Sequence, residues 1–157
     1  MYRWWVLLHI VGVAGFLLSH GVSMFVLFRI REGGLDRERI LDYATLSGQT
    51  TAPMYLFLAM LLVGGIAAGI VGKWFSYFWI WGALIVLVLT MAGMYGVARP
   101  YFARVKAACE VRPSGVPRVS DEELAQILRG PTTQVIAAIG GIGLLIILYF
   151  MVFKPGV

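Results

Sequence analysis

The stretch LLHIVGVAGFLLSHGVSMFVLF, residues 7–28, runs for 22 residues without a charged side chain. An α-helix rises about 1.5 Å per residue, so about 20 residues cross the roughly 30 Å of hydrocarbon in a bilayer. The run is too long for the apolar core of a signal peptide and has no small-residue cleavage site. We therefore expect it to remain in the mature protein as a membrane span.

The rest of the chain has the same character. It is 60% hydrophobic and only 13% charged, with a mean hydropathy of +0.84, whereas about 25% of the residues in soluble domains are charged. Apolar runs of spanning length lie near residues 4–28, 53–71, 75–98 and 133–153, separated by polar loops at 29–52 and 99–132. The sequence thus predicts an all-α protein, with residues 1–157 forming a single membrane domain built as a four-helix transmembrane bundle.

The positive charges predict how this bundle is oriented. Of the 13 lysines and arginines, ten lie in the segments Arg29–Arg39 and Arg99–Arg129. The positive-inside bias makes both loops cytoplasmic and places both termini outside. Tryptophan favours the membrane interface, and all five tryptophans fall at the predicted external end: Trp4, Trp5, Trp74, Trp79 and Trp81. No basic aromatic patch suggests nucleic acid, so we expect membrane lipid as the main partner.

The first polar loop contains signals for a short helix. Gly33 and Gly34 are expected to end the first span. From Asp36 onward, apolar residues recur at helical spacing, which predicts a short amphipathic helix along the cytoplasmic membrane surface. Thr50 and Pro53 then suggest a hydroxyl-capped start of the second span with proline in its first turn.

Two further features concern packing between spans. Gly65 and Gly69 form a GxxxG pattern in the second span, which permits close internal helix packing. The turn at residues 72–76 is very short, so the second and third spans are expected to be antiparallel neighbours.

The second polar loop is expected to begin where Arg99 and Pro100 end the third span. Ser120 and Glu123 form a capping box for a second short cytoplasmic helix. Gly130 and Pro131 then stop that helix and start the fourth span.

The only two histidines, His9 and His20, both lie in the first span. Eleven residues are three helical turns plus about 20°, so the two rings share one face and lie about 16 Å apart along the axis. They cannot ligate the same ion or heme iron from one helix. Each is a candidate metal ligand or cofactor ligand; alternatively, His9 is an interfacial polar residue and His20 hydrogen-bonds Thr90 or a backbone carbonyl of a neighbouring span.

Methionine is the other candidate ligand. Met91 and Met94 lie three residues apart on one face of the third span. Thioethers together with imidazoles suit copper(I) or an axial position on heme iron, although methionine also fills apolar cores. The single cysteine, Cys109, excludes an intrachain disulfide or a thiolate cluster and is expected to be a free thiol.

The order of these features resembles a known group. The stretch LLHIVGVAGFLLSHGVSMFVLFRIRE, the entry TTAPM and the ending GPTTQ to FKP are similar to the HemJ-type protoporphyrinogen oxidase group and its relatives. Those relatives are copper-resistance-D-like proteins and an uncharacterised bacterial integral membrane family, which is the most similar of the three. The resemblance implies a multi-pass protein of the bacterial inner membrane, with His9 at the position of a heme ligand.

One departure bears on activity. The oxidases carry a functional lysine early in the third span, where this chain reads FSYFWIWGALIVL and has none. This argues against porphyrinogen oxidation and against an enzyme.

Three functional hypotheses remain. The first is a heme b-binding or redox-associated protein that uses His9 and His20, with bis-histidine ligation requiring a homodimer or another chain. The second is a non-catalytic accessory subunit of a larger respiratory or photosynthetic membrane complex. The third is copper handling through the histidines with Met91 and Met94.

Overall fold

The computed structural model describes residues 1–157 and is helical throughout, with no strands. The α-helices are α1 (Tyr2–Glu32), α2 (Arg37–Gln49), α3 (Thr51–Val71), α4 (Phe78–Cys109), α5 (Asp121–Arg129) and α6 (Thr132–Phe153), and a 3-10 helix η1 (Trp74–Ser76) joins α3 to α4. The predicted all-α class is confirmed.

Four helical segments are long and apolar enough to cross a membrane. They are α1, the combined segments Arg37–Val71 and Asp121–Phe153, and α4. Each has at least 31 residues, whereas about 20 suffice to span the hydrocarbon. The structure therefore supports a multi-pass membrane protein with four spanning helices.

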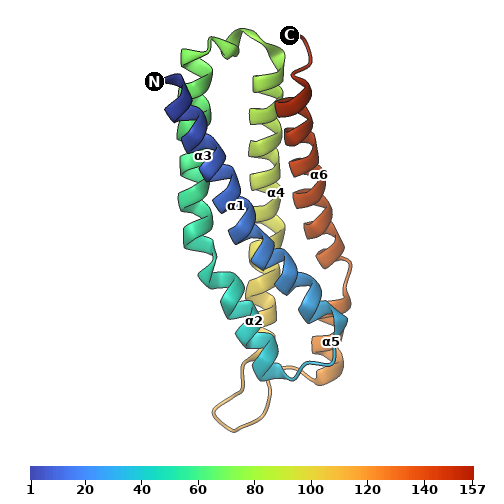
Figure 1. The fold of residues 1–157 in the computed structure, drawn as a ribbon. Coiled ribbons are helices and arrows are strands. Elements are labelled where there is room, and N and C mark those ends of the chain that lie inside the picture. The colour runs from blue at the N-terminus through green and yellow to red at the C-terminus, as the bar shows by residue number, and fades with distance from the viewer.

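The two ends of the molecule, seen in Figure 1, differ in composition. Both termini and η1 lie at one end, and α5 and the loop before it lie at the other. At the first end, the Lys154 ammonium lies 4.9 Å from the ring centre of Trp74 and 5.7 Å from that of Trp79. At the other end lie the two segments that carry most of the basic residues. We refer to these as the tryptophan end and the basic end.

The spanning helices form two pairs rather than an evenly packed bundle. α1 packs along α3, and α4 packs along α6, whereas the backbones of α3 and α4 stay farther apart and the Ile80 side chain of α4 lies against Gly69 of α3. Figure 1 shows α3 and α4 running in opposite directions from the connection at the tryptophan end. The predicted antiparallel direction is correct, although each of the two helices packs more closely against its partner, α1 or α6, than against the other. The connection includes η1 and the left-handed residue Lys73 (φ 58°), which together separate the two helix ends.

The main cluster of buried apolar residues lies at the basic end. One cluster of twelve buried residues joins α1, α2, α4, α5 and α6 there: Val26, Leu27, Ile30, Ile40, Ala44, Tyr101, Val105, Ala108, Cys109, Leu124, Leu128 and Ile136. The short helices α2 and α5 therefore close the end of the bundle by burying their apolar faces against the long helices.

The predicted cap at the start of α5 is confirmed, and α2 begins with a similar cap. The Asp36 carboxylate accepts a hydrogen bond from the Arg39 backbone N–H (2.8 Å), and the Ser120 hydroxyl accepts one from the Glu123 backbone N–H (3.1 Å). Gly33, just after α1, has φ +83°, a conformation that costs glycine little because it has no Cβ.

The boundaries around α3 differ from the prediction. Thr50 does not cap α3; its hydroxyl donates to the Ser47 carbonyl at 2.8 Å, because Thr50 itself has helical backbone angles. α2 therefore continues almost directly into α3, as Figure 1 shows.

The third long helix also differs from the prediction. α4 continues through Pro100 to Cys109, so Arg99 and Pro100 do not end the helix. Proline in a helix interior conflicts with the carbonyl four residues earlier, which here belongs to Gly96.

Candidate functional site

Both histidines face the interior of the molecule. On α1, Leu7, Val11 and Leu18 are exposed, whereas His9 and His20 are half-buried on the opposite side of the helix. The rings therefore do not point outward into lipid.

His9 is positioned by α3. Its Nδ1 atom lies 2.8 Å from the Leu61 carbonyl oxygen. A carbonyl can only accept, so this contact assigns the proton to Nδ1 and leaves the lone pair on Nε2. The ring lies over Gly65, where a Cβ would be 2.8 Å from Nδ1. Gly65 thus provides close internal packing, as the GxxxG pattern predicted.

His20 has different neighbours. Its ring stacks on Phe16, one turn earlier, with the centroids 5.6 Å apart and the planes 7° from parallel. No hydrogen bond to a protein group holds the ring. The predicted bond to Thr90 is not formed, because the Thr90 side chain lies against Gly143 of α6 instead.

Three helices meet at the end of the His20 ring. A Cβ on Gly140 of α6 would lie 3.4 Å from His20 Nε2 and 3.9 Å from Met94 Sδ of α4. An imidazole nitrogen and a thioether sulfur thus both lie close to Gly140, which has no side chain. We call His20, Met94 and Gly140 the His20 site.

Met91 and Met94 do not act together. Met94 is half-buried and packs toward the core, while Met91 is 39% exposed. Residues three apart lie on the same side of a helix, and of the two methionines Met94 is the one that lies beside Gly140 and His20. Met91 does not join the His20 site.

His9 and His20 also belong to different sites. His9 contacts α3 and His20 contacts α6, because α1 crosses from one helix pair toward the other (Figure 1). Although both rings lie on one face of α1, they therefore do not reach the same ligand.

The donor set of the His20 site restricts the ligands it can hold. The chain contains no group of three or more His, Cys, Asp or Glu side chains arranged around a metal position. Oxygen-liganded metals such as Mg²⁺ and Ca²⁺ prefer carboxylates and carbonyls, whereas imidazole with thioether suits heme iron or copper(I). His20 and Met94 thus offer one nitrogen donor and one sulfur donor.

Cys109 is a free thiol, as expected, and is buried. It belongs to the cluster at the basic end and takes no part in the His20 site.

Comparisons with protein-family models, with curated proteins and with solved structures found no match to this chain. The resemblance to the HemJ-type group therefore stays a prediction.

Proposed function

We propose that this chain is a multi-pass membrane protein that binds a redox-active metal, first of all a heme iron, through His20 and Met94. The observation that carries the proposal is the convergence of His20 Nε2 and Met94 Sδ on Gly140, from three different helices.

The chemistry of these groups suits the holding of a heme iron. A neutral imidazole nitrogen and a thioether sulfur are established axial ligands of electron-transfer hemes, in which methionine raises the reduction potential. When bound, such a group supplies one-electron transfer. Phe16 holds the His20 ring in one orientation by stacking on it, and this protein supplies binding and orientation.

His9 is the second candidate ligand, and the resemblance to the HemJ-type oxidases is what suggests it. Its geometry suits that role, because donation from Nδ1 to Leu61 orients the ring and leaves Nε2 free. The oxidase lysine has no counterpart here, so we propose a binding or electron-transfer role and no porphyrinogen oxidation.

Copper(I) is the second candidate occupant of the His20 site. Two observations favour it: the thioether donor, and Phe16 packed directly on the His20 ring. A bare ion needs far less space between α1, α4 and α6 than a macrocycle does.

We further propose that the basic end faces the cytoplasm and that the protein resides in the bacterial inner membrane. Ten basic residues lie toward one end of the molecule, and the tryptophans lie toward the other. This distribution supports the proposed orientation.

Absorption spectroscopy of the protein purified from heme-replete cells tests the first occupant. We expect a Soret band with a low-spin spectrum in the wild type. Replacement H20A should remove the band, and M94L should convert the spectrum to high spin because one axial ligand is lost. M91L is the matched control and should leave the spectrum unchanged, because Met91 faces away from the site.

The other outcomes separate the alternatives. Loss of the band in His9→Ala with retention in His20→Ala would assign the ligand to the position that the resemblance suggests. A colourless protein that carries copper after growth in copper-rich medium, and loses it in M94L, would establish the second occupant. A protein with neither heme nor copper would contradict the proposed function.

A further inference from the structure

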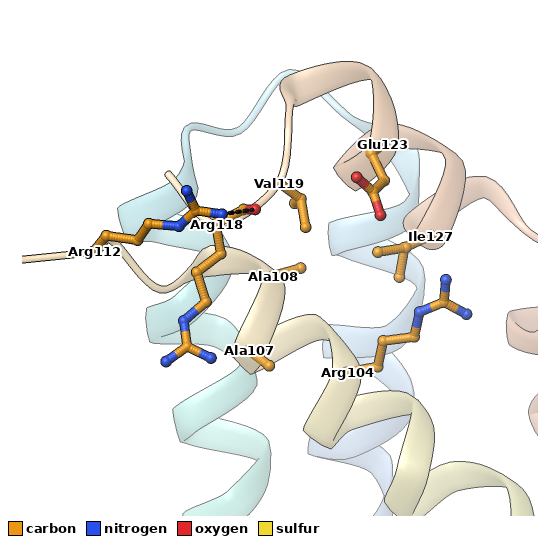
Figure 2. A pocket seen from close by; sticks show the side chains of 8 residues that line it. All are labelled: Arg104, Ala107, Ala108, Arg112, Arg118, Val119, Glu123 and Ile127. Atoms are coloured by element: carbon orange, nitrogen blue, oxygen red, sulfur yellow. Dashed lines mark hydrogen bonds between the residues drawn. The ribbon is translucent and has the colours of Figure 1, made fainter. Parts of the chain in front are cut away.

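The two helix pairs come from the two halves of the chain. The first half contains α1, α2 and α3, the second half contains α4, α5 and α6, and η1 lies in the connection between them. At the tryptophan end, this connection and the contact of Ile80 with Gly69 join the halves. At the basic end, Arg37 of α2 donates to the carbonyls of Ala108 and Val119, which Figure 2 shows on α4 and on the loop before α5. The two halves are therefore tied together at both ends of the molecule.

Between these ends, the two halves share little interior. Between 17% and 22% of the most apolar stretch of each spanning helix is buried inside the protein, and the main buried cluster lies at the basic end. The closest backbone approach between the two helix pairs is that of α1 to α6. Contact between the halves inside the membrane therefore depends on few side chains.

The side-chain hydrogen bonds between helices follow the same division. In the first half, the Ser47 hydroxyl donates to that of Ser23 at 3.0 Å. In the second half, the Thr133 and Tyr101 hydroxyls are 3.3 Å apart. The hydrogen bonds that join α2 of the first half to the second half come from Arg37, at the basic end. Packing, and not hydrogen bonding, therefore brings the halves together along the spans.

His20 is the side chain of the first half that reaches both long helices of the second. It lies in the charge-free run, eight residues before Phe28, or roughly 12 Å along the helix axis. Its Nε2 atom lies beside Gly140 of α6, and the Sδ atom of Met94 of α4 lies beside the same glycine. The ring stacks on Phe16, which belongs to α1 itself. The nitrogen donor of the His20 site thus comes from one half of the chain and the sulfur donor from the other.

We propose that His20 and Met94 form a metal-dependent clamp, which fastens the two halves of the chain to each other inside the membrane. The clamp rests on the proposed function, because it requires a metal to bind these two donors. A metal held by both donors is bound only when the halves lie together. Binding therefore shifts the protein toward that arrangement by mass action, and occupancy of the His20 site regulates how firmly the halves are joined.

Gly140 offers a variant that separates occupancy of the site from helix packing. The atoms nearest to a Cβ at this position would lie 3.4 to 3.9 Å away, which is ordinary contact distance, so alanine fits without displacing a helix. Its methyl group would lie beside both donor atoms and compete with a metal for the space. We therefore expect Gly140→Ala to fold normally and to lose the metal. Gly141→Ala is the matched control, because a Cβ there would meet nothing within 4 Å.

Distances between spin labels on the two halves test the clamp in the full-length, detergent-solubilised protein. Leu56 of α3 and Leu89 of α4 are exposed, so labelled cysteines at these positions leave the interior unchanged. Cys109→Ala removes the native thiol. Pulsed electron paramagnetic resonance compares the protein before and after loading with copper(I) or with ferrous heme. We expect loading to narrow the distribution of distances between the two labels.

The variants assign this narrowing to the His20 site. Met94→Leu and Gly140→Ala should lose it, whereas Met91→Leu and Gly141→Ala should retain it. Metal analysis and absorption spectra of the same samples measure binding separately. For copper(I), Met94→Leu should lower the affinity by at least about tenfold, because even changes in the outer shell of a metal site cost 10- to 100-fold. Circular dichroism checks that each variant keeps its helices.

The outcomes separate the clamp from the proposed function. A wild type that binds either metal with no change in the distances would overturn the clamp alone. Narrowing in Gly140→Ala equal to that of the wild type would also overturn it, because the metal would then lie elsewhere. A wild type that binds neither copper(I) nor heme would overturn the proposed function, and the clamp with it.

Discussion

Replacing Arg37 with methionine is expected to open the basic end of the molecule, lowering the free energy of its local unfolding by about 2 to 4 kcal/mol. The Arg37 guanidinium donates to the Ala108 carbonyl at 2.8 Å and to the Val119 carbonyl at 2.7 Å. It also binds the Asp121 carboxylate at 2.7 Å, and its side chain is only 16% exposed. One side chain of α2 thus connects the end of α4 to the start of α5. Methionine keeps much of the apolar volume but leaves both carbonyls without this donor.

Cys109 provides the measurement, because it is the only cysteine and is buried next to Ala108. We expect its thiol to react roughly 30 to 1,000 times faster with a maleimide in Arg37→Met, if labelling follows the population of the open form. Arg39→Met is the matched control: Arg39 is on the same helix and is exposed, and its contact with Asp36 is long, at 3.9 Å. An exposed ion pair contributes only about 0 to 1 kcal/mol. Equal labelling rates in the two variants would show that Arg37 does not hold this end together.

Much of the fold could be predicted from the sequence because its causes are local. Charge-free runs of spanning length specify the long helices. Ser120 specifies a helix start, since its hydroxyl accepts from a backbone N–H three residues later. Thr50 shows the limit of such signals, because its hydroxyl found the Ser47 carbonyl as an alternative acceptor within the continuing helix.

The pairing of helices and the membership of the His20 site depend on contacts between distant segments, so periodicity alone could not predict them. Helical spacing correctly placed His9 and His20 on one face of α1. Because α1 runs from α3 toward α6, His9 contacts α3 and His20 contacts α6. The same applies to Gly140, whose importance lies in the atoms that approach it from α1 and α4. The only sequence signal for it was the density of glycines in the first half of the fourth span.

The close contact between α1 and α3 leads to the second large prediction. A Cβ on Gly12 would overlap the Leu61 backbone nitrogen and lie 2.7 Å from Leu61 Cα and 2.9 Å from the Met60 carbonyl carbon. These are backbone atoms, so no side-chain rotation can relieve the overlap. Even Gly12→Ala must move the two helices apart, which we expect to cost about 1 to 3 kcal/mol as overpacking does in other well-packed cores. Separation of α1 from α3 would also lengthen the contact between His9 and Leu61, because His9 lies one turn from Gly12 on the same side of α1.

Gly21→Ala is the matched control, because a Cβ at Gly21 of the same helix would meet nothing within 4 Å. Alanine has a higher helix propensity than glycine by about 1 kcal/mol, so this substitution should be neutral or stabilising. The measurement is the loss of helical circular dichroism on titration of the detergent-solubilised protein with sodium dodecyl sulfate, which should occur at a lower fraction of that detergent in Gly12→Ala only. A Gly12→Ala protein as stable as Gly21→Ala would mean that α1 and α3 are farther apart than described, and the contact between His9 and Leu61 would then lose its support as well.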